Sequence, residues 1–158
     1  MTKIKIFDKV RVSEALFRQS ITHLISIGDP GESRPNGDSF AKVLRLEFHD
    51  IEQPEPGCVT PHLSDVLQAL KFADLAKQAD GNLAVHCTGG ISRSTAIALC
   101  ILADRLGDPE LALQQLLAVA PDAQPNELIV QMIEDWVPGF QGFTARVRAH
   151  NLTFVEPL

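Results

Sequence analysis

The amino-acid sequence predicts a single α/β domain over residues 1–158, with a central, mostly parallel and twisted sheet of about four to five strands flanked by helices. Short apolar segments with strand character alternate along the chain with longer segments of helical periodicity. Clusters of glycine, proline and polar residues separate these segments. A length of 158 residues, of which 45% are hydrophobic, is enough for one sizeable core. Because strands that alternate with helices usually pair in parallel, the sheet is expected to be mostly parallel.

The N-terminal segment, residues 1–20, is expected to form a strand and a short helix. Residues 3–7 alternate between lysine and apolar side chains, which predicts a strand at an edge of the sheet. Residues 12–20 carry apolar side chains at helical spacing, and Ser13 is expected to cap this helix.

Two further strands and a long loop follow. Residues 21–28 form a nearly continuous apolar run that predicts a buried strand, and residues 41–48 alternate again and predict a third strand. The stretch between them is rich in Gly, Pro, Ser and Asn and is expected to be an exposed loop. Residues 49–60 form a second loop, whose length and prolines favour a functional role. Thr60 is expected to cap the next helix, with Pro61 at its first position.

The second half of the chain predicts one strand followed by helices. Residues 83–87 are apolar and predict a strand. A helix of small and apolar residues is expected over residues 94–106, closed by Gly107. Residues 109–119 predict another helix, and residues 125–138 predict the last one.

The C-terminal extension, residues 139–158, has the weakest pattern. Residues 143–149 alternate weakly, and residues 152–155 contain an apolar group. These features favour a strand that returns to the sheet.

Composition limits the classes of partner. The net charge of −6 disfavours nucleic acid and anionic membrane surfaces as partners. The sequence contains no apolar run of the ~18–20 residues that a membrane-spanning helix needs. The N-terminus has a strand pattern instead of a signal peptide, so a cytoplasmic location is expected. Three cysteines without close spacing indicate free thiols in a reducing compartment. Nothing in the sequence indicates an oligomeric state.

One stretch combines the end of a strand, a turn with two glycines and the start of a helix. Such a turn points backbone N–H groups inward, where the helix dipole adds positive potential. The sequence therefore predicts an oxyanion site whose binding groups come from Thr88, Gly89, Gly90, Ile91 and Ser92.

Cys87 and Arg93 stand at the two ends of this turn, with five residues between them. Amides, a helix N-terminus and a facing arginine all favour the thiolate form of a cysteine, and a thiolate can attack phosphorus. The planar guanidinium can make two parallel hydrogen bonds to a phosphate. An arginine in the first turn of a helix opposes the helix dipole, and a bound anion would explain it. The pair predicts phosphoryl chemistry without a metal or another cofactor.

The spacing of His86, Cys87, Arg93 and Ser94 resembles the signature loop of cysteine-dependent protein tyrosine and dual-specificity phosphatases, and Gly90 stands where that family has its loop glycine. Compact bacterial-type members match best. The resemblance implies a dual-specificity-phosphatase-like fold and removal of phosphate from phosphotyrosine through a cysteinyl-phosphate intermediate. Phosphoserine and phosphothreonine stay open as further substrates, and the partner is a phosphorylated protein or a small phosphomonoester. The loop interior contains no lysine or second arginine, which disfavours polyphosphoinositides.

The resemblance also implies three supporting roles. Ser94 matches the hydroxyl that hydrogen-bonds the cysteine sulfur and helps it leave. His86 matches a histidine that orients the loop. The pair Pro125-Asn126 resembles one that braces the catalytic loop, although Asn126 as a plain helix cap explains this residue equally well.

The same chemistry requires an acid that protonates the leaving group and then activates water. In the family an aspartate on a loop before the central helix supplies it, and Asp50 in the segment Phe48-His49-Asp50-Ile51 resembles that aspartate. Glu52 and Glu55 on the same loop, and Asp29 after an earlier strand, are the alternatives.

Two other functions stay open at this stage. Arsenate reduction also uses a thiolate in an oxyanion loop, and Cys58 would be its resolving partner. A non-catalytic phosphate-binding module usually lacks the nucleophile or the arginine, and both are present here. Cys58 is further hypothesised to form a protective disulfide with Cys87, whereas Cys100 is expected to be buried and inert. His49 and His62 lack the additional ligands of a metal site.

Overall fold

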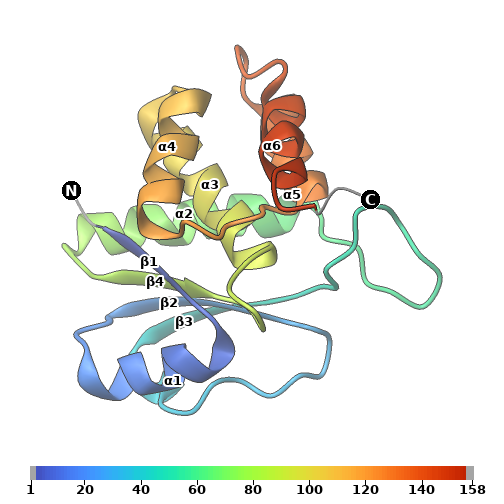
Figure 1. Ribbon diagram of the computed structural model, residues 1–158. Coiled ribbons are helices and arrows are strands. Elements are labelled where there is room, and N and C mark those ends of the chain that lie inside the picture. Colours follow the sequence, from blue (N-terminus) through green and yellow to red (C-terminus); the bar gives the residue numbers. More distant parts are fainter. Residues whose placement is uncertain (1–2, 156–158) are drawn as a thin grey trace.

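The computed structural model describes residues 3–155 and contains a parallel four-stranded sheet with helices on both faces (Figure 1). The strands are β1 (Ile4–Phe7), β2 (His23–Gly28), β3 (Lys42–Glu47) and β4 (Leu83–His86). Their order across the sheet is β1-β4-β2-β3, and each neighbouring pair is parallel. The predicted α/β class is confirmed, and the first predicted strand does lie at an edge.

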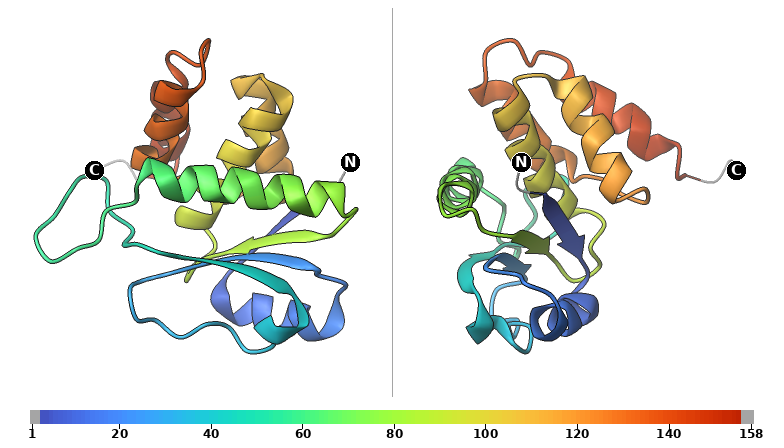
Figure 2. Two further views of the ribbon diagram at one scale, coloured as in Figure 1. Left: turned by 180° about the vertical axis from the view of Figure 1, so that it is seen from behind. Right: turned by 90° about the vertical axis from the view of Figure 1, so that its left-hand side faces the viewer.

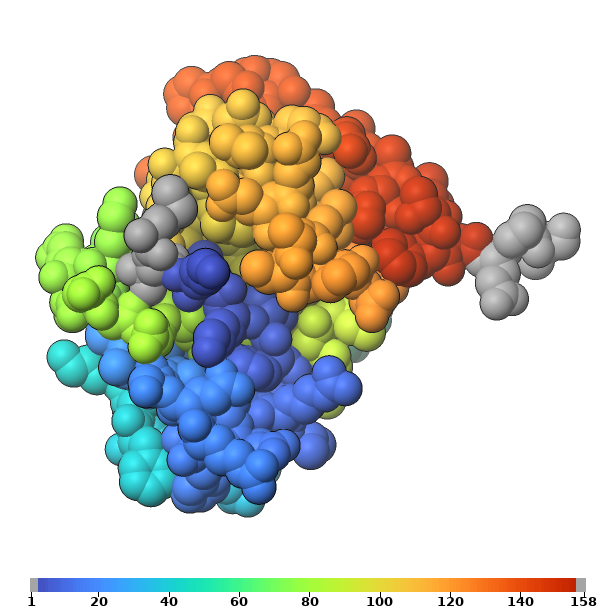
Figure 3. Space-filling view, turned by 60° about the vertical axis from the view of Figure 1, so that its left-hand side comes forward, coloured from blue at the N-terminus to red at the C-terminus, as the bar shows by residue number. Residues whose placement is uncertain are grey.

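Helices cover the two faces of the sheet unequally (Figures 1 and 2). One face carries α1 and a short 3-10 turn, and the other side holds the remaining helices, with α3 at their centre. In the space-filling view, the helical half in yellow to red lies above the blue N-terminal part (Figure 3). The bounds are α1 (Lys9–Arg18), η1 (Asp38–Phe40), α2 (Leu63–Gln78), α3 (Arg93–Leu106), α4 (Pro109–Val119), α5 (Glu127–Trp136) and α6 (Phe143–Leu152).

The two faces of the sheet pack into two separate cores, because successive strand residues point to opposite faces. Ile25 and Val85 belong to the larger core beneath α2 to α6, which also contains most of α3. Leu24 and Ala84 belong to the smaller core beneath α1. Residues two positions further along the same strands, Ser26 and His86, therefore point to the α1 face.

The carboxyl ends of the four strands meet at one edge of the sheet, because all strands are parallel. Asp8 follows β1, Asp29 follows β2, the 49–60 loop follows β3 and Cys87 follows β4. Parallel α/β sheets bind their ligands at this edge. The segments singled out by the sequence are thus brought together by topology.

Two predicted helix starts are wrong. α1 begins at Lys9 because the carboxylate of Asp8 accepts the N–H of Arg11 at 2.7 Å, and Ser13 lies inside the helix with its hydroxyl bonded to the carbonyl of Lys9. α2 begins at Leu63 and not at Pro61. Its cap is His62, whose N–H is accepted by the carboxylate of Asp65 at 2.8 Å.

The predicted strand in the C-terminal extension is also wrong. Residues 143–152 form α6, whose buried Phe143 and Val147 are four residues apart, as on one face of a helix. Residues 153–155 form a turn, and residues 156–158 lie outside the described part of the chain. Within residues 3–155, no helix has the length and apolar character that crossing a membrane requires.

Candidate active site

The signature loop, residues 87–93, connects the end of β4 to the first turn of α3. Gly90 in this loop has a φ of +68°, a conformation that L side chains rarely adopt. A Cβ at Gly90 would also come within 2.7 Å of the backbone nitrogen of Asp8. Glycine at this position therefore lets the loop bend tightly against the end of β1.

The sulfur of Cys87 lies at the base of the signature loop. The residue as a whole is only 3% exposed. The N–H of Gly90 donates to the sulfur at 3.2 Å, and the hydroxyl oxygen of Ser94 lies 3.1 Å from it. Ser94 is itself fully buried in the first turn of α3. An amide donor, a hydroxyl and a helix N-terminus thus surround one thiol, and each of them favours its thiolate form.

The guanidinium of Arg93 is anchored on one side. Its Nη1 donates to the carboxylate of Asp29 at 2.7 Å and to the carbonyl of Phe48 at 2.8 Å, so both Nη1 protons are used. Its Nη2 donates to the hydroxyl of Thr88 at 3.1 Å. The Nε is buried and has no partner within residues 3–155. The edge formed by Nε and Nη2 therefore retains donors for a ligand, and this edge can make two parallel bonds to an oxyanion.

Asp50 lies against the far end of the signature loop. Its Oδ1 accepts from the hydroxyl of Ser92 at 2.8 Å and from the amide of Asn126 at 2.9 Å. Asp50 is exposed, whereas Asn126 is fully buried. The structure thus brings the aspartate of the 49–60 loop to the signature loop.

The side chain of Asn126 makes two further hydrogen bonds. Its Oδ1 accepts the N–H of Ile129, which makes it the N-cap of α5, and its Nδ2 also donates to the carbonyl of Ile51. Asn126 is therefore the helix cap that the sequence allowed, and its side chain also holds the 49–60 loop. At the base of the same loop, the Nδ1 of His49 accepts the N–H of Val59 at 2.8 Å.

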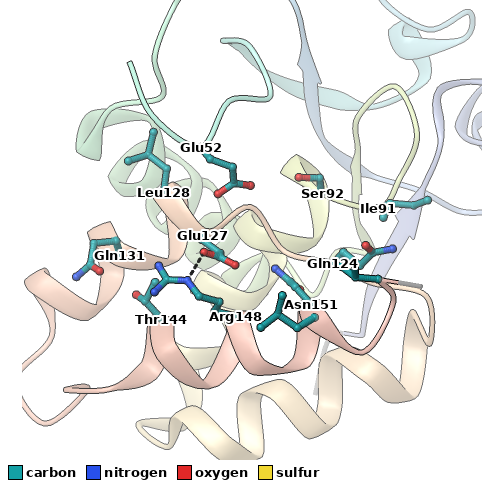
Figure 4. Close-up of a pocket in the computed structure, with 12 residues that line it drawn as sticks. Glu52, Ile91, Ser92, Gln124, Glu127, Leu128, Gln131, Thr144, Arg148 and Asn151 are labelled. Carbon is teal, nitrogen blue, oxygen red and sulfur yellow. Dashed lines mark hydrogen bonds and ion pairs between the residues drawn. The ribbon is translucent and has the colours of Figure 1, made fainter. Parts of the chain in front are cut away.

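Of the alternative acids, Glu52 lies at a neighbouring cavity. It lines a cavity of about 620 Å³ that begins at Ile91 and Ser92 and extends between α5 and α6 (Figure 4). Arg148 and Glu127 form an ion pair of 2.8 Å in this cavity. Burial, with the nearby charge of Glu127, raises the pKa of Glu52.

The remaining alternatives occupy different surroundings. Asp29 is bound to Arg93, as described above, and Glu55 is exposed on the 49–60 loop. Asp29 is therefore at the site, on the side of the arginine, whereas Asp50 is on the side of Ser92.

Glu32 is a residue at the site that sequence reasoning missed. Its carboxylate accepts the N–H of Asp29 at 2.9 Å, the ammonium of Lys9 at 3.2 Å and the hydroxyl of Thr88 at 3.4 Å. Burial alone would raise the pKa of Glu32, but the bond from Asp29 and the cations Lys9 and Arg93 lower it overall. In the sequence, the one feature that could have indicated a role for Glu32 is its position three residues after Asp29, in the loop after a parallel strand.

His86 is buried directly behind the nucleophile. Its Nε2 lies 2.7 Å from the hydroxyl of Ser26, and its Nδ1 lies 3.2 Å from the carbonyl of Cys87. Burial is the main cause that lowers the pKa of this imidazole. A neutral ring that bonds to the loop backbone has the geometry of a support and not of a general base.

Cys58 and Cys100 make none of the site contacts described above. Cys87, Cys58 and Cys100 are all free thiols, and Cys100 is buried in α3, where burial raises its pKa. In the described residues, no three His, Cys, Asp or Glu side chains gather as a metal site would require.

Comparisons with known proteins point to one family. No family model matches the chain. Mouse dual specificity protein phosphatase 15 is 30% identical over 132 residues, which cover 82% of this chain and 52% of that protein. Dual specificity protein phosphatase 1 of Arabidopsis thaliana is 28% identical over 120 residues, which cover 73% and 55%, respectively. The chain thus spans about half the length of these two relatives.

Solved structures of the same group share the fold. The crystal structure of DUSP15 aligns with a TM-score of 0.70 at 22% identity, covering 94% of this chain and 92% of that one. Human DUSP28 aligns with a TM-score of 0.69 at 18% identity, covering 93% and 94%, respectively.

Proposed function

We propose that this chain, which belongs to the dual-specificity protein phosphatase family, hydrolyses phosphomonoesters through a cysteinyl-phosphate intermediate. Phosphotyrosine in proteins is the proposed first substrate, with phosphoserine and phosphothreonine as further ones. The observation that carries the proposal is the contact set of Cys87, whose sulfur receives the N–H of Gly90 and lies beside the hydroxyl of Ser94. A buried thiol in this setting has no packing role that would require these neighbours.

In the first step, the Cys87 thiolate attacks phosphorus and the bond from phosphorus to the leaving oxygen breaks. The loop amides and the Nε–Nη2 edge of Arg93 bind the phosphoryl oxygens, whose charge they stabilise in the transition state. The anchoring of Nη1 by Asp29 and Phe48 orients the open edge of the guanidinium, and the free Nε of Arg93 lies on that edge. Both observations support this assignment.

Asp50 is the proposed acid of the first step and the base of the second. It donates a proton to the leaving oxygen and then removes one from the water that attacks the cysteinyl-phosphate. The bonds from Ser92 and Asn126 to its Oδ1 support this role, because they hold the carboxyl at the rim of the signature loop. When the sulfur leaves, the hydroxyl of Ser94 stabilises the returning thiolate.

Kinetics with two aryl phosphates test this proposal. C87S is expected to abolish hydrolysis of para-nitrophenyl phosphate. D50N retains an oxygen for Ser92 and Asn126 but no ionisable proton. We expect D50N to slow phenyl phosphate, the poorer leaving group, about 100-fold or more, and para-nitrophenyl phosphate much less.

E55Q on the same exposed loop is the matched control and should leave both rates unchanged. An inactive wild type, or C87S with full activity, would overturn the phosphatase proposal. If D50N slows both substrates equally while another carboxylate variant discriminates between them, the acid is that other residue. Phosphotyrosine and phosphoserine peptides then define the substrate class.

A further inference from the structure

Three side chains form a row across the sheet on the α1 face. Ser26 on β2 is in register with Arg45 on β3 and with His86 on β4. Residues in register on neighbouring strands point to the same face, so the three side chains are adjacent. Ser26 and His86 are buried, and the side chain of Arg45 is 10% exposed. The row ends one residue before Cys87.

The hydrogen bonds in this row run in one direction. Nη1 of Arg45 lies 2.8 Å from the hydroxyl oxygen of Ser26, and a guanidinium can only donate. The Ser26 oxygen therefore accepts from Arg45. The carbonyl of Cys87, 3.2 Å from Nδ1 of His86, can only accept, so Nδ1 of the neutral ring donates and the Ser26 hydroxyl gives its proton to Nε2 at 2.7 Å. Nε2 is therefore the acceptor of the neutral ring, and Nδ1 carries the proton.

This tautomer links the row of side chains to the backbone of the nucleophile. The Nδ1–H of His86 donates to the carbonyl of Cys87 at 3.2 Å, which fixes the peptide plane from which the signature loop starts. Arg45, Lys9 and Glu32 are the charged groups that influence the ring. The two cations oppose a second proton on His86, in the same direction as burial.

The second nitrogen of Arg45 holds the other side of the site. Nη2 donates to the carbonyl of Glu32 at 2.7 Å, in the turn that carries Asp29 to Arg93. A Cβ at Gly28 would collide with this nitrogen, so the glycine at the end of β2 makes room for the arginine. One guanidinium therefore braces the histidine behind the nucleophile and the turn beside the phosphate-binding arginine.

We propose that Arg45 is a positioning residue for Cys87, and that it acts through Ser26, the tautomer of His86 and the carbonyl of Cys87. The inference rests on the proposed function only in its kinetic consequence, since the thiol can be probed without a phosphate ester. When the row is broken, His86 no longer holds one tautomer. The loop amides then stabilise the Cys87 thiolate less.

The test compares R45M, R45K and S26A with R105M. Arg105 is a half-buried arginine that donates to a backbone carbonyl in α2 at 3.0 Å, remote from the signature loop, so R105M matches R45M in burial and loss of charge. The readout is the rate of iodoacetamide alkylation of Cys87 against pH, followed by peptide mass spectrometry. Cys58 in the same molecule is the internal reference.

We expect R45M and S26A to move the Cys87 profile to higher pH and to lower kcat/KM for para-nitrophenyl phosphate about tenfold, the effect of roughly one hydrogen bond. Besides Ser26 and Glu32, Arg45 also contacts Glu47 at 3.4 Å through Nε. R45K should be intermediate, because a single ammonium cannot reach Ser26 and Glu32 at the same time. The Cys58 profile and R105M should match wild type. Unchanged Cys87 profiles in R45M and S26A, or an equal shift in R105M, would overturn the inference.

Nitrogen NMR of the wild-type histidine rings provides a measurement that needs no variant. We expect a protonated Nδ1 and an unprotonated Nε2 for His86 at neutral pH, and the reverse tautomer would contradict the row. If the wild type has no phosphatase activity but R45M and S26A still shift the Cys87 profile relative to it, the proposed function is refuted and this inference stands.

Discussion

The contact between Asp29 and Arg93 leads to a quantitative prediction for the variant D29A. Asp29 accepts from Nη1 at 2.7 Å, on the side of the guanidinium opposite the edge that we assign to phosphate. Its removal leaves the carbonyl of Phe48 as the remaining anchor of Nη1 and lets the guanidinium rotate. We expect D29A to weaken oxyanion binding, because the open edge of Arg93 is no longer held toward the signature loop.

The magnitude follows from the exposure of the pair. The side chain of Arg93 is 7% exposed, but that of Asp29 is 52% exposed. Water therefore screens the contact. We expect D29A to lose about 1 kcal/mol of oxyanion-binding free energy, the upper value for an exposed ion pair. That energy corresponds to about a fivefold increase in the dissociation constant. D29N keeps an oxygen acceptor, so its dissociation constant for the oxyanion should rise about twofold or less.

Competitive inhibition by vanadate measures this effect directly, with D38A as control. Asp38 lies on the same connecting segment and pairs with Arg34 at the surface, so D38A removes an equal charge away from the site. Tighter vanadate binding in D29A would refute the reasoning, since it would mean that Asp29 competes with the anion for Arg93. Discrimination between good and poor leaving groups by D29N would instead make Asp29 the acid.

Three further predictions concern stability and pH. N126A removes the α5 cap and two bonds to the 49–60 loop, and should lower the free energy of unfolding by about 2–4 kcal/mol in urea titrations, whereas an unchanged midpoint would contradict the bracing role. G90A places a Cβ against Asp8 at positive φ and should lose about 1–3 kcal/mol along with most of its activity, and a fully active G90A would show that the loop has another conformation. The carboxylate of Glu134 accepts two N–H groups at the start of α6, and the bonds from Thr144 lower its pKa. Its stabilisation is thus present above the ordinary pKa of about 4.5 and lost as pH falls through the lower folded value, so E134Q should be less stable by a few tenths of a kcal/mol at pH 7 and equal to wild type in acid.

Local chemistry made the signature loop predictable. Cys87, Gly90 and Arg93 lie within seven residues, so their spacing alone describes a strand, an oxyanion turn and a helix start. Asp50 could be placed near this turn because the 49–60 loop directly follows a predicted strand. The parallel topology then brings the 49–60 loop and the signature loop to the same edge of the sheet, because the carboxyl ends of parallel strands lie together.

The parts that sequence could not predict depend on long-range partners. Arg45 and Ser26 look like ordinary strand residues, and only the register of β3 and β2 makes them neighbours of His86. Asp29 could be placed at the correct edge, but not against Arg93. The helix α6 was missed because its buried face consists of few residues, and a weak alternation over the same stretch outweighed them.

The central claim is that Cys87 itself becomes phosphorylated. Rapid denaturation of the enzyme during turnover of para-nitrophenyl phosphate, followed by peptide mass spectrometry, tests this directly. We predict one phosphoryl group on the peptide that contains Cys87, and none in C87S. Hydrolysis that proceeds without this adduct, or a phosphoryl group on another residue, would contradict the claim.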